Sequence, residues 1–494
     1  MDYVSTRCGD KRVESAKAIL TGIAPDGGLF TPATLPHIHT SQITYLRTLP
    51  YAERAAWLLG SFLTDFTPEE LNDFASRAYS RFDTPDVAPV VPCGPNTQIL
   101  ELFHGPTCAF KDMALQILPY LLTASMRKCG IDDEVTILVA TSGDTGKAAL
   151  EGFADVEGTR IMVFYPENGV SRVQKLQMIT QEGKNVAVCA VKGNFDDAQT
   201  GVKKIFGDSE FRAKLAENHI RLSSANSINW GRLAPQIVYY FSAYCDLLNN
   251  GTIADGEKIN VCVPTGNFGN ILAAYFAKRM GLPIARLICA SNANNVLTEF
   301  LQTGHYNARR PFFTTTSPSM DILVSSNVER LLFELSEHDG NAVAGWMRQL
   351  SENGCYTLPD SMTETLRNEF SAGFCDDDAT LACIRRCFND YGYLPDTHTA
   401  VALSVLDSYR AETGDDTVTV VDATASPFKF APDVVRAITD ETVPENEDAA
   451  ARLSELTGLT VPDPIRLLAG KPVRFTDSVE KSAMLGAVSK VLLG

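Results

Sequence analysis

The chain has 494 residues, 45% of them apolar, which is enough for two to four domains or for one large protein with a sizeable core. Its 60 acidic and 43 basic side chains give a formal net charge of −17, and no basic block occurs, so we expect no binding to nucleic acid or to anionic membranes. We find no secretory signal and no apolar stretch of bilayer length, and the twelve scattered cysteines include no CxxC pair, so we expect a cytoplasmic, globular protein with reduced thiols and no metal site.

The two ends of the chain differ in composition from its centre. Residues 1–92 contain Pro-rich loops and a helical, acidic stretch at 67–82, and a Pro- and Val-rich link at 83–96 follows them. We interpret 1–92 as an N-terminal domain. Residues 435–494 carry an acidic run and a short helical tail, which we interpret as a C-terminal helical extension. The main domain is then expected over 93–434.

Short β-rich runs alternate with helical patterns through the main domain. Near-continuous apolar strands separated by amphipathic helices indicate a parallel sheet covered on both faces, so the predicted fold class is α/β. The predicted strands are 134–140, 160–166, 185–191, 259–264, 285–291 and 418–423.

Two strand-to-helix junctions have a form that favours anion binding. In "VATSGDTGKAAL" (139–150) and "VPTGNFGNILAA" (263–274), a strand ends in a loop with two glycines and a helix follows at once. Glycine permits close approach of a ligand, and the free N–H groups at a helix start attract an anion. Neither loop is a Walker or GxGxxG loop, which disfavours ATP and dinucleotides. Each loop alone is equally well explained as a connecting turn, but two such loops at strand ends in one sheet favour ligand binding.

Lys111 lies in the apolar stretch "HGPTCAFKDMALQ" (104–116). If Phe110 and the surrounding apolar turns partly desolvate it, its amine is favoured over its ammonium form, as Schiff-base chemistry requires. The alternative is a solvated lysine that starts a helix and pairs with Asp112. Together with two anion sites, an amine nucleophile suggests a pyridoxal phosphate cofactor, with one site for its phosphate and the other for the carboxylate of an amino acid joined to it.

Ten segments carry a resemblance to a known family. They occur along nearly the whole chain, and their order and combination are more specific than any one of them. The chain resembles the threonine synthase family, within the fold type II pyridoxal-phosphate enzymes that include the tryptophan synthase β subunit. The segments are "YVSTR" (3–7), "APDGGLF" (24–30), "LFHGPTCAFKD" (102–112), "TSGDTG" (141–146), "GVSRVQKLQM" (169–178), "SANSINWGRLAPQ" (224–236), "PTGNFGN" (264–270), "MDILVSSNVER" (320–330), "THTAVA" (397–402) and "TASPFKF" (424–430).

The resemblance implies two lobes, each with a parallel sheet, and a set of cofactor-binding residues. Lys111 matches the lysine that holds pyridoxal phosphate as a Schiff base and later moves protons. Thr424 matches the hydroxyl that faces the pyridine nitrogen, and Asp144 stands near the cofactor's O3′, where many fold type II relatives have Asn. The implied cofactor-binding residues are Phe110, Lys111, Asp144, Gly266, Asn267, Phe268, Gly269, Asn270 and Thr424.

The resemblance also implies where the substrate binds. The loop at 142–145 receives the substrate carboxylate, and "SANSINWGR" supplies groups for the substrate phosphate, with Lys147 and Lys429 as further cations. The implied substrate-binding residues are Ser142, Gly143, Thr145, Lys147, Asn226, Ser227, Asn229 and Arg232. His398 is interpreted as a residue that caps or supports a helix, and His104 as equally suited to the turn and to proton transfer.

The implied reaction converts O-phospho-L-homoserine and water into L-threonine and phosphate, as a carbon–oxygen lyase acting on phosphates. Two alternatives stay open. A phospho-lyase of the same fold would release phosphate and 2-oxobutyrate from the same substrate, and a binding protein of the same fold would catalyse nothing. The intact Lys111 and phosphate loop argue against the second. The oligomeric state stays open between a monomer and a homodimer.

Overall fold

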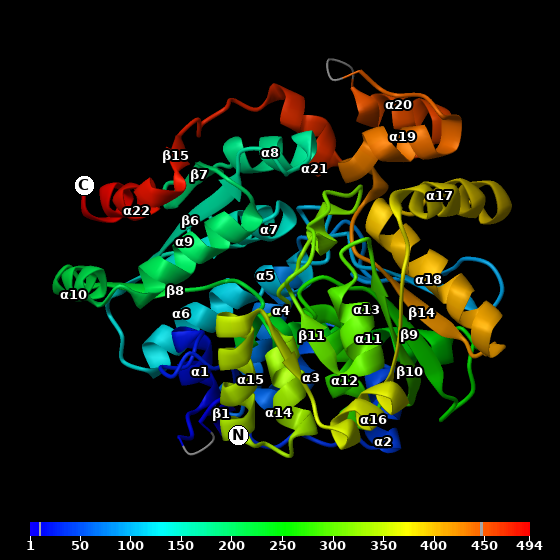
Figure 1. The fold of residues 1–494 in the computed structure, drawn as a ribbon, viewed down its shortest axis with the longest axis horizontal. Coiled ribbons are helices and arrows are strands. Elements are labelled where there is room, and N and C mark those ends of the chain that lie inside the picture. Colours follow the sequence, from blue (N-terminus) through cyan, green and yellow to red (C-terminus); the bar gives the residue numbers. More distant parts are fainter. Residues whose placement is uncertain (9–10, 445–447) are drawn as a thin grey trace.

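A computed structural model describes residues 1–8, 11–444 and 448–494. Its two main sheets lie side by side, with β6, β7 and β8 at the upper left of Figure 1 and β9, β10 and β14 at the right. In this part of the chain, one sheet has six strands in the order β13 (Phe370–Phe374), β10 (Ile284–Ser291), β9 (Ile259–Pro264), β14 (Thr419–Ala423), β4 (Thr97–Glu101) and β3 (Val90–Pro92). The other has five, in the order β15 (Ser478–Glu480), β7 (Val186–Lys192), β6 (Thr159–Pro166), β5 (Glu134–Ala140) and β8 (Ile220–Ser223).

The α/β prediction is confirmed, and all six predicted strands are present with ends within one residue of those expected. Every pairing in the two sheets is parallel except that of β3 with β4. One expectation was wrong: the two glycine-containing junctions do not share a sheet, because β5 belongs to the five-stranded sheet and β9 to the six-stranded one. Two short antiparallel pairs, β1 (Tyr3–Ser5) with β2 (Phe30–Pro32) and β11 (His305–Asn307) with β12 (Cys355–Thr357), complete the strands.

Helices cover both sheets. The helix predicted at 67–82 is α4, whose N-cap Thr67 accepts a hydrogen bond from the backbone of Glu70 and which has Pro68 in its first turn. The helices are α1 (Ser15–Thr21), α2 (Thr40–Leu46), α3 (Tyr51–Phe62), α4 (Pro68–Tyr79), α5 (Asp112–Leu115), α6 (Leu118–Lys128), α7 (Asp144–Phe153), α8 (Arg172–Ile179), α9 (Phe195–Gly207), α10 (Ser209–Glu217), α11 (Trp230–Asn249), α12 (Gly269–Arg279), α13 (Val296–Thr303), α14 (Val328–Leu335), α15 (Gly340–Asn353), α16 (Asp360–Glu369), α17 (Asp377–Tyr391), α18 (Thr397–Thr413), α19 (Ala431–Thr439), α20 (Ala449–Thr457), α21 (Asp463–Arg466) and α22 (Met484–Leu493).

The N-terminal helices share one hydrophobic core with the centre of the molecule. Side chains of α1, α3 and α4 pack in the same buried cluster as those of α6, α11 and β5. The long helix α11 is buried along nearly its whole length, since only Asp246 and Asn249 of its 20 residues are not buried. A boundary at residue 92 therefore separates segments of the sequence and not separate hydrophobic cores.

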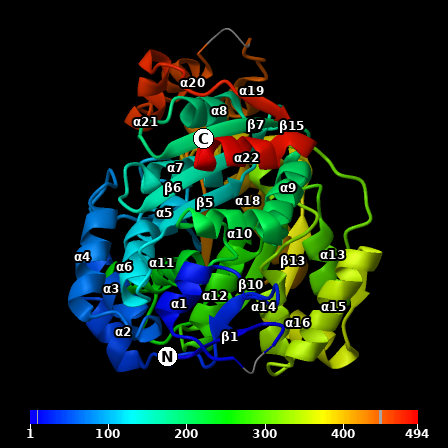
Figure 2. The same ribbon diagram turned by 90° about the vertical axis from the view of Figure 1, so that its left-hand side faces the viewer.

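The C-terminal segment packs on the five-stranded sheet. Strand β15 extends this sheet by pairing with β7, and α22 lies beside α9 (Figure 2), with Met484, Val488 and Leu492 buried against it. The segment thus contributes a strand to the sheet in addition to the predicted helices. Among the described residues, no helix combines the length and apolar character needed to cross a membrane.

Candidate functional site

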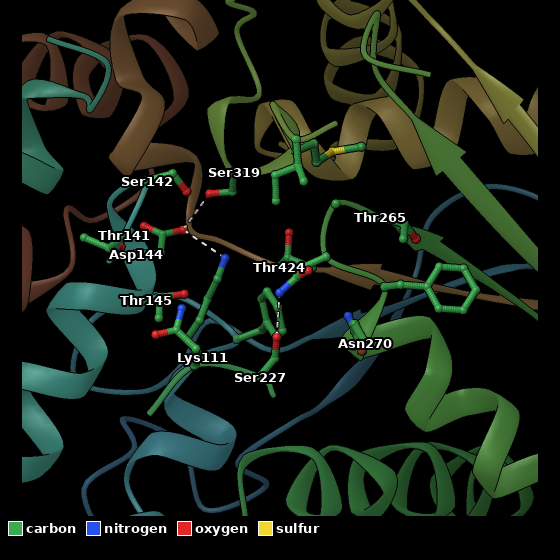
Figure 3. Close-up of a pocket in the computed structure, with 18 of the residues that line it drawn as sticks. Lys111, Thr141, Ser142, Asp144, Thr145, Ser227, Thr265, Asn270, Ser319 and Thr424 are labelled. Carbon is green, nitrogen blue, oxygen red and sulfur yellow. Dashed lines mark hydrogen bonds and ion pairs between the residues drawn. The ribbon is translucent and has the colours of Figure 1, made fainter. Parts of the chain in front are cut away.

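A cavity of about 890 Å³, its mouth included, lies between the two sheets. Its walls come from residues that directly follow β5, β9 and β14, so the carboxyl ends of strands from both sheets meet there. Figure 3 shows side chains from these loops and from Lys111 and Ser319 converging on the same space.

The loop after β5 is held in a tight turn. The Thr141 hydroxyl accepts hydrogen bonds from the backbone N–H groups of Gly143 and Gly146, at 2.9 and 2.8 Å, which ties the loop to the first turn of α7. Gly143 has a φ of +132°, and a Cβ there would lie 2.4 Å from the Gln174 side chain. No other residue fits this position without movement, and the turn directs Ser142 toward the cavity.

The loop after β9 brings the start of α12 to the cavity. A Cβ on Gly266 would come within 2.8 Å of the Ser319 carbonyl oxygen, so the backbone here closely approaches the opposite wall. Phe268 adopts a left-handed conformation with φ +63°, and α12 begins at the next residue. Asn270, in the first turn, has a buried Nδ2 with no partner among the described residues. Free donors at a helix N-terminus form an anion site.

Lys111 immediately precedes α5 and extends into the cavity. Its Nζ lies 3.3 Å from Asp144 Oδ2 and 4.2 Å from the centre of the Phe110 ring (Figure 3). It does not pair with Asp112, whose carboxylate accepts hydrogen bonds from the backbone and hydroxyl of Thr107 at 2.8 and 2.9 Å. Burial lowers the pKa of Lys111, although Asp144 opposes the shift. The uncharged amine is therefore more populated than in an exposed lysine.

Asp144 is surrounded by donors. Its Oδ1 lies 2.7 Å from Lys429 Nζ and 2.9 Å from Gln174 Nε2, while Ser319 Oγ approaches Oδ2 at 3.4 Å. Burial by itself would raise the pKa of Asp144, but Lys429 and Lys111 outweigh burial and hold this pKa well below the usual aspartate range. Asp144 is thus ionised throughout the neutral range.

Arg232, in the first turn of α11, forms a second cationic group at the cavity. Its guanidinium donates to the Ala225 carbonyl at 2.9 Å and to the Thr145 hydroxyl at 3.2 Å, and no described carboxylate pairs with it. Burial lowers its pKa to about 10, so it stays charged at neutral pH. A buried guanidinium without a counter-ion is suited to bind an anionic ligand.

Most of the predicted site residues meet in this cavity. They come from positions up to 314 residues apart in the chain, from Phe110 to Thr424. Those that line the cavity are Phe110, Lys111, Ser142, Asp144, Thr145, Asn226, Ser227, Arg232, Gly266, Asn267, Phe268, Gly269, Asn270 and Thr424.

Three predicted substrate-binding residues do not line it. Lys147 donates to Glu151 at 2.9 Å on the far side of α7, and also to Gln181. Asn229 is the N-cap of α11, where its side chain accepts from the backbone of Gly231 at 2.9 Å. Gly143 shapes the turn described above. Lys147 and Asn229 use their polar groups within the protein, and neither belongs to the cavity wall.

The cavity also has walls that the sequence did not indicate. Ser319 and Met320 lie on one side, and Gln236 follows Arg232 by one helical turn. His398 also lines the cavity: its Nδ1 lies 2.8 Å from Asp396, the N-cap of α18, and its Nε2 accepts from the Ser319 backbone at 3.2 Å. Gln236 and His398 lie inside motifs that had been noticed, but only their packing shows which members face a ligand.

Three families match the chain. "Threonine synthase N terminus" matches residues 2–79, "Pyridoxal-phosphate dependent enzyme" matches 99–423, and "Threonine synthase, C-terminal" matches 399–477. Together they account for most of the sequence, and the second alone covers more than half of it.

Named relatives agree with these matches. The chain is 42% identical to Threonine synthase-like 1 of Homo sapiens over 450 residues, which is 89% of this chain and 59% of the human protein. The chain thus spans about three fifths of the length of this relative. It is 34% identical to the threonine synthase of Eremothecium gossypii over 521 aligned positions, which cover 99% of this chain and 98% of that protein.

A solved structure shows the same architecture. The PLP-bound threonine synthase of Brucella melitensis superposes on the chain with a TM-score of 0.87 and 38% sequence identity, with both chains covered completely. Agreement over the whole length of both chains includes the N-terminal helices and the C-terminal segment as well as the two sheets. On the sequence matches and on this superposition, the chain belongs to the threonine synthase family of pyridoxal-phosphate-dependent enzymes.

Proposed function

We propose that the chain is a threonine synthase that converts O-phospho-L-homoserine and water into L-threonine and phosphate, with pyridoxal phosphate as cofactor. The observation that carries the proposal is the position of Lys111, whose amine lies in a cavity lined by two anion sites and by the unpaired Arg232 guanidinium. These three anion-binding groups match the three anions that would meet there: the cofactor phosphate, and the carboxylate and the phosphate of the substrate.

The residues of the cavity fit pyridoxal phosphate. Lys111 would hold it covalently, the loop from Gly266 to Asn270 would bind its phosphate, and Thr424 would face its ring nitrogen. The glycines of this loop, the helix start that follows it and the unpartnered side-chain donor Asn270 Nδ2 support the phosphate assignment, because free donors at a helix N-terminus bind an anion. When bound, the cofactor withdraws electrons from the substrate's Cα and so makes its proton removable.

Lys111 is placed to move protons. Its Nζ is buried, its pKa is lowered by that burial, and one carboxylate approaches it at 3.3 Å. An amine with a pKa nearer to neutrality both takes and returns a proton readily. We assign to it the removal of the Cα proton of the substrate and the later return of a proton to the product.

Arg232 would bind the substrate phosphate, with Asn226, Ser227 and Thr145 beside it in the cavity wall. A proton leaves Cβ as the phosphate leaves Cγ with the electrons of the Cγ–O bond; water then supplies the hydroxyl at Cβ, and protons return to Cγ and Cα. A fixed guanidinium stabilises the departing charge without reorganisation during the reaction. Ser142 and the backbone N–H groups that start α7 would bind the substrate carboxylate, since Asp144 is itself ionised and would repel it.

Product analysis tests the proposal. The purified protein, loaded with pyridoxal phosphate, is given O-phospho-L-homoserine, and phosphate, threonine and 2-oxobutyrate are followed together. We expect threonine to form in step with phosphate, Lys111→Ala to abolish both, and Lys184→Ala, at an exposed lysine, to change neither. Absence of phosphate release would overturn the proposal.

The same measurement distinguishes a second candidate, a phospho-lyase that releases 2-oxobutyrate. Relatives of 34–42% identity are named both threonine synthase and threonine synthase-like, so both products are followed. Phosphate accompanied by 2-oxobutyrate would establish the lyase.

We further infer a cytoplasmic location, because all twelve cysteines are free thiols and most of them are buried.

A further inference from the structure

Lys429 lies behind the cavity and not in it. It belongs to the turn Pro427–Phe430, its side chain is completely buried, and it is absent from the cavity wall. Its Nζ lies 2.7 Å from Asp144 Oδ1 and donates to the Thr107 carbonyl at 3.0 Å. Lys429 therefore has two well-placed acceptors, and neither is a ligand group.

Lys111 is held less firmly by the same carboxylate. It approaches the other oxygen of Asp144, Oδ2, at 3.3 Å and has no second acceptor among the described residues. The two oxygens of Asp144 are thus divided: Oδ1 is taken by Lys429 and by Gln174 at 2.9 Å, and Oδ2 faces the cavity.

The charges in this cluster decide which lysine is the free amine. One carboxylate balances one of two buried ammonium groups, and a third cation, Arg232, adds to the positive field at Lys111. The carboxylate of Asp112, next to Lys111 in the chain, accepts hydrogen bonds from Thr107 and does not pair with Lys111. Lys429 is the better-placed partner of Asp144, because a buried ammonium is stabilised by a close carboxylate and short hydrogen bonds.

We propose that Lys429 is a positioning residue that neutralises Asp144 from behind, so that Lys111 gives up its proton more readily and can react as an amine with the cofactor aldehyde. The inference rests on the proposed function, because it assigns a purpose to that amine. Without Lys429, the charge of Asp144 would be balanced by Lys111, which would then hold a proton to higher pH.

The ionisation of Lys111 measures this effect directly. In the full-length chain freed of cofactor, the acetylation of Lys111 by acetic anhydride is quantified by mass spectrometry as a function of pH. We expect Lys429→Gln to raise the midpoint by about one pH unit, which is a tenfold loss of free amine below the midpoint. Lys429→Arg, which keeps the charge, should leave the midpoint within about a third of a unit of the wild type.

A double substitution separates action through Asp144 from direct repulsion between the two lysines. If Lys429 acts through the carboxylate, its effect should largely disappear when the carboxylate is absent. In the Asp144→Asn background, adding Lys429→Gln should move the acetylation midpoint by less than a third of the shift that Lys429→Gln causes in the wild type. An equal shift in both backgrounds, or a shift with Lys429→Arg as large as with Lys429→Gln, would overturn the proposal. Lys147→Gln, at a buried lysine paired elsewhere, serves as the control and should cause no shift.

Uptake of pyridoxal phosphate is measured separately by absorbance in the same variants. Slower uptake by Lys429→Gln at neutral pH, recovered at higher pH, is the expected result. A chain that shows the acetylation shift but takes up no cofactor would sustain the role of Lys429 and overturn the proposed function.

Discussion

At the scale of single residues, the cavity depends on charges that are buried without a full set of partners. Arg232 illustrates this, because its only described acceptors are a carbonyl and a hydroxyl. Burying such a group costs free energy, and an anion that binds to it recovers part of this cost. The unpaired guanidinium therefore favours the binding of an anionic ligand. The same reasoning separates Arg232 from Lys147, which is equally buried but already paired with Glu151.

Substituting Arg232 should weaken substrate binding. We expect Arg232→Met to raise KM for O-phospho-L-homoserine by about tenfold to a hundredfold, since a charged hydrogen bond contributes about 1.5–3 kcal/mol. Steady-state phosphate release gives KM and kcat. Lys147→Met is the matched control, with KM within about twofold of the wild type, and an equal rise in both variants would contradict the assignment.

Asp422 gives a second prediction, based on counting protons. Tyr240 has one hydroxyl hydrogen, but its oxygen lies 2.7 Å from both Asn270 Oδ1 and Asp422 Oδ2. If Tyr240 donates to Asn270, Asp422 must be protonated to donate to Tyr240. Burial raises the pKa of Asp422 to about 7, in agreement with this count.

Stability should therefore fall as pH rises, because the folded state keeps a proton that the unfolded state has already lost. For a raised pKa, this loss runs from the unfolded value, about 4, up to the folded value, and amounts to about 2–3 kcal/mol between pH 5 and 7. Asp422→Asn, whose amide also donates to Tyr240, should remove that slope. Urea unfolding of the wild type and of Asp422→Asn at several pH values provides the measurement. If the free energy of unfolding changes equally with pH in both proteins, Asp422 is not protonated in the folded state.

Much of the site could be predicted from the sequence because its main parts are local. The loops after β5 and β9 and the residues around Lys111 are continuous segments, so their glycines and helix starts can be recognised from the sequence alone. Ser319 lies outside the recognised segments, and His398 lies inside one but was interpreted as supporting a helix, because only tertiary packing shows that both reach the cavity. Lys429 was expected to meet the substrate phosphate, and only its partners show that it faces Asp144.

At the scale of elements, strand prediction succeeded where apolar runs are long. The run at 134–140 is β5 to the residue, because six of its seven residues are buried. β13, "FSAGF", and β15, "SVE", were missed, since they are short edge strands without a continuous apolar run and owe their conformation to the neighbouring strand.

Arg330 connects several elements around the cavity. This buried residue of α14 donates to the Phe30 carbonyl at 2.9 Å, the Ile228 carbonyl at 2.6 Å and Asn327 Oδ1 at 2.6 Å. Asn327 in turn donates to the Ser227 hydroxyl at 2.9 Å. One guanidinium thus joins β2, the loop before α11 and α14, and it orients a residue of the cavity wall.

Removing it should destabilise the protein as a whole. Arg330→Met leaves several buried acceptors without donors, at about 1–3 kcal/mol each, so we expect a loss of about 3–5 kcal/mol in the free energy of unfolding. Urea denaturation is the measurement. Arg348→Met, at an exposed arginine of α15, should change it by no more than about 0.5 kcal/mol. Similar losses in both would mean that the buried contacts contribute little.

At the scale of the molecule, the sequence could not show which strands share a sheet. The two junctions were expected in one sheet, but β5 and β9 lie in different ones, and β4 pairs with β14 although more than 300 residues separate them. Strand order depends on long-range packing that local patterns do not encode. The cavity exists because the chain places the ends of both sheets opposite each other.

The C-terminal segment should be an integral part of this architecture. Val488 of α22 is completely buried in the cluster beneath α9, whereas Lys490 on the same helix is exposed. Val488→Asp should lower the free energy of unfolding by about 3 kcal/mol or more, because it buries an unpaired carboxylate and removes apolar contact. Lys490→Asp should change it by less than about 0.5 kcal/mol, and urea denaturation of both variants gives the comparison. Equal stability of the two variants would show that α22 does not pack as described.

The position of β14 has a consequence for how the protein is made. This strand, residues 419–423, lies between β9 and β4, and Thr424 follows it directly into the cavity. During translation β4 and β9 emerge long before β14. β4 can pair with β3, and β9 with β10, but the other edge of each strand has no native partner until β14 leaves the ribosome. The six-stranded sheet is therefore completed late, and its exposed strand edges need protection meanwhile, which makes a nascent chain of this architecture a natural client for chaperones.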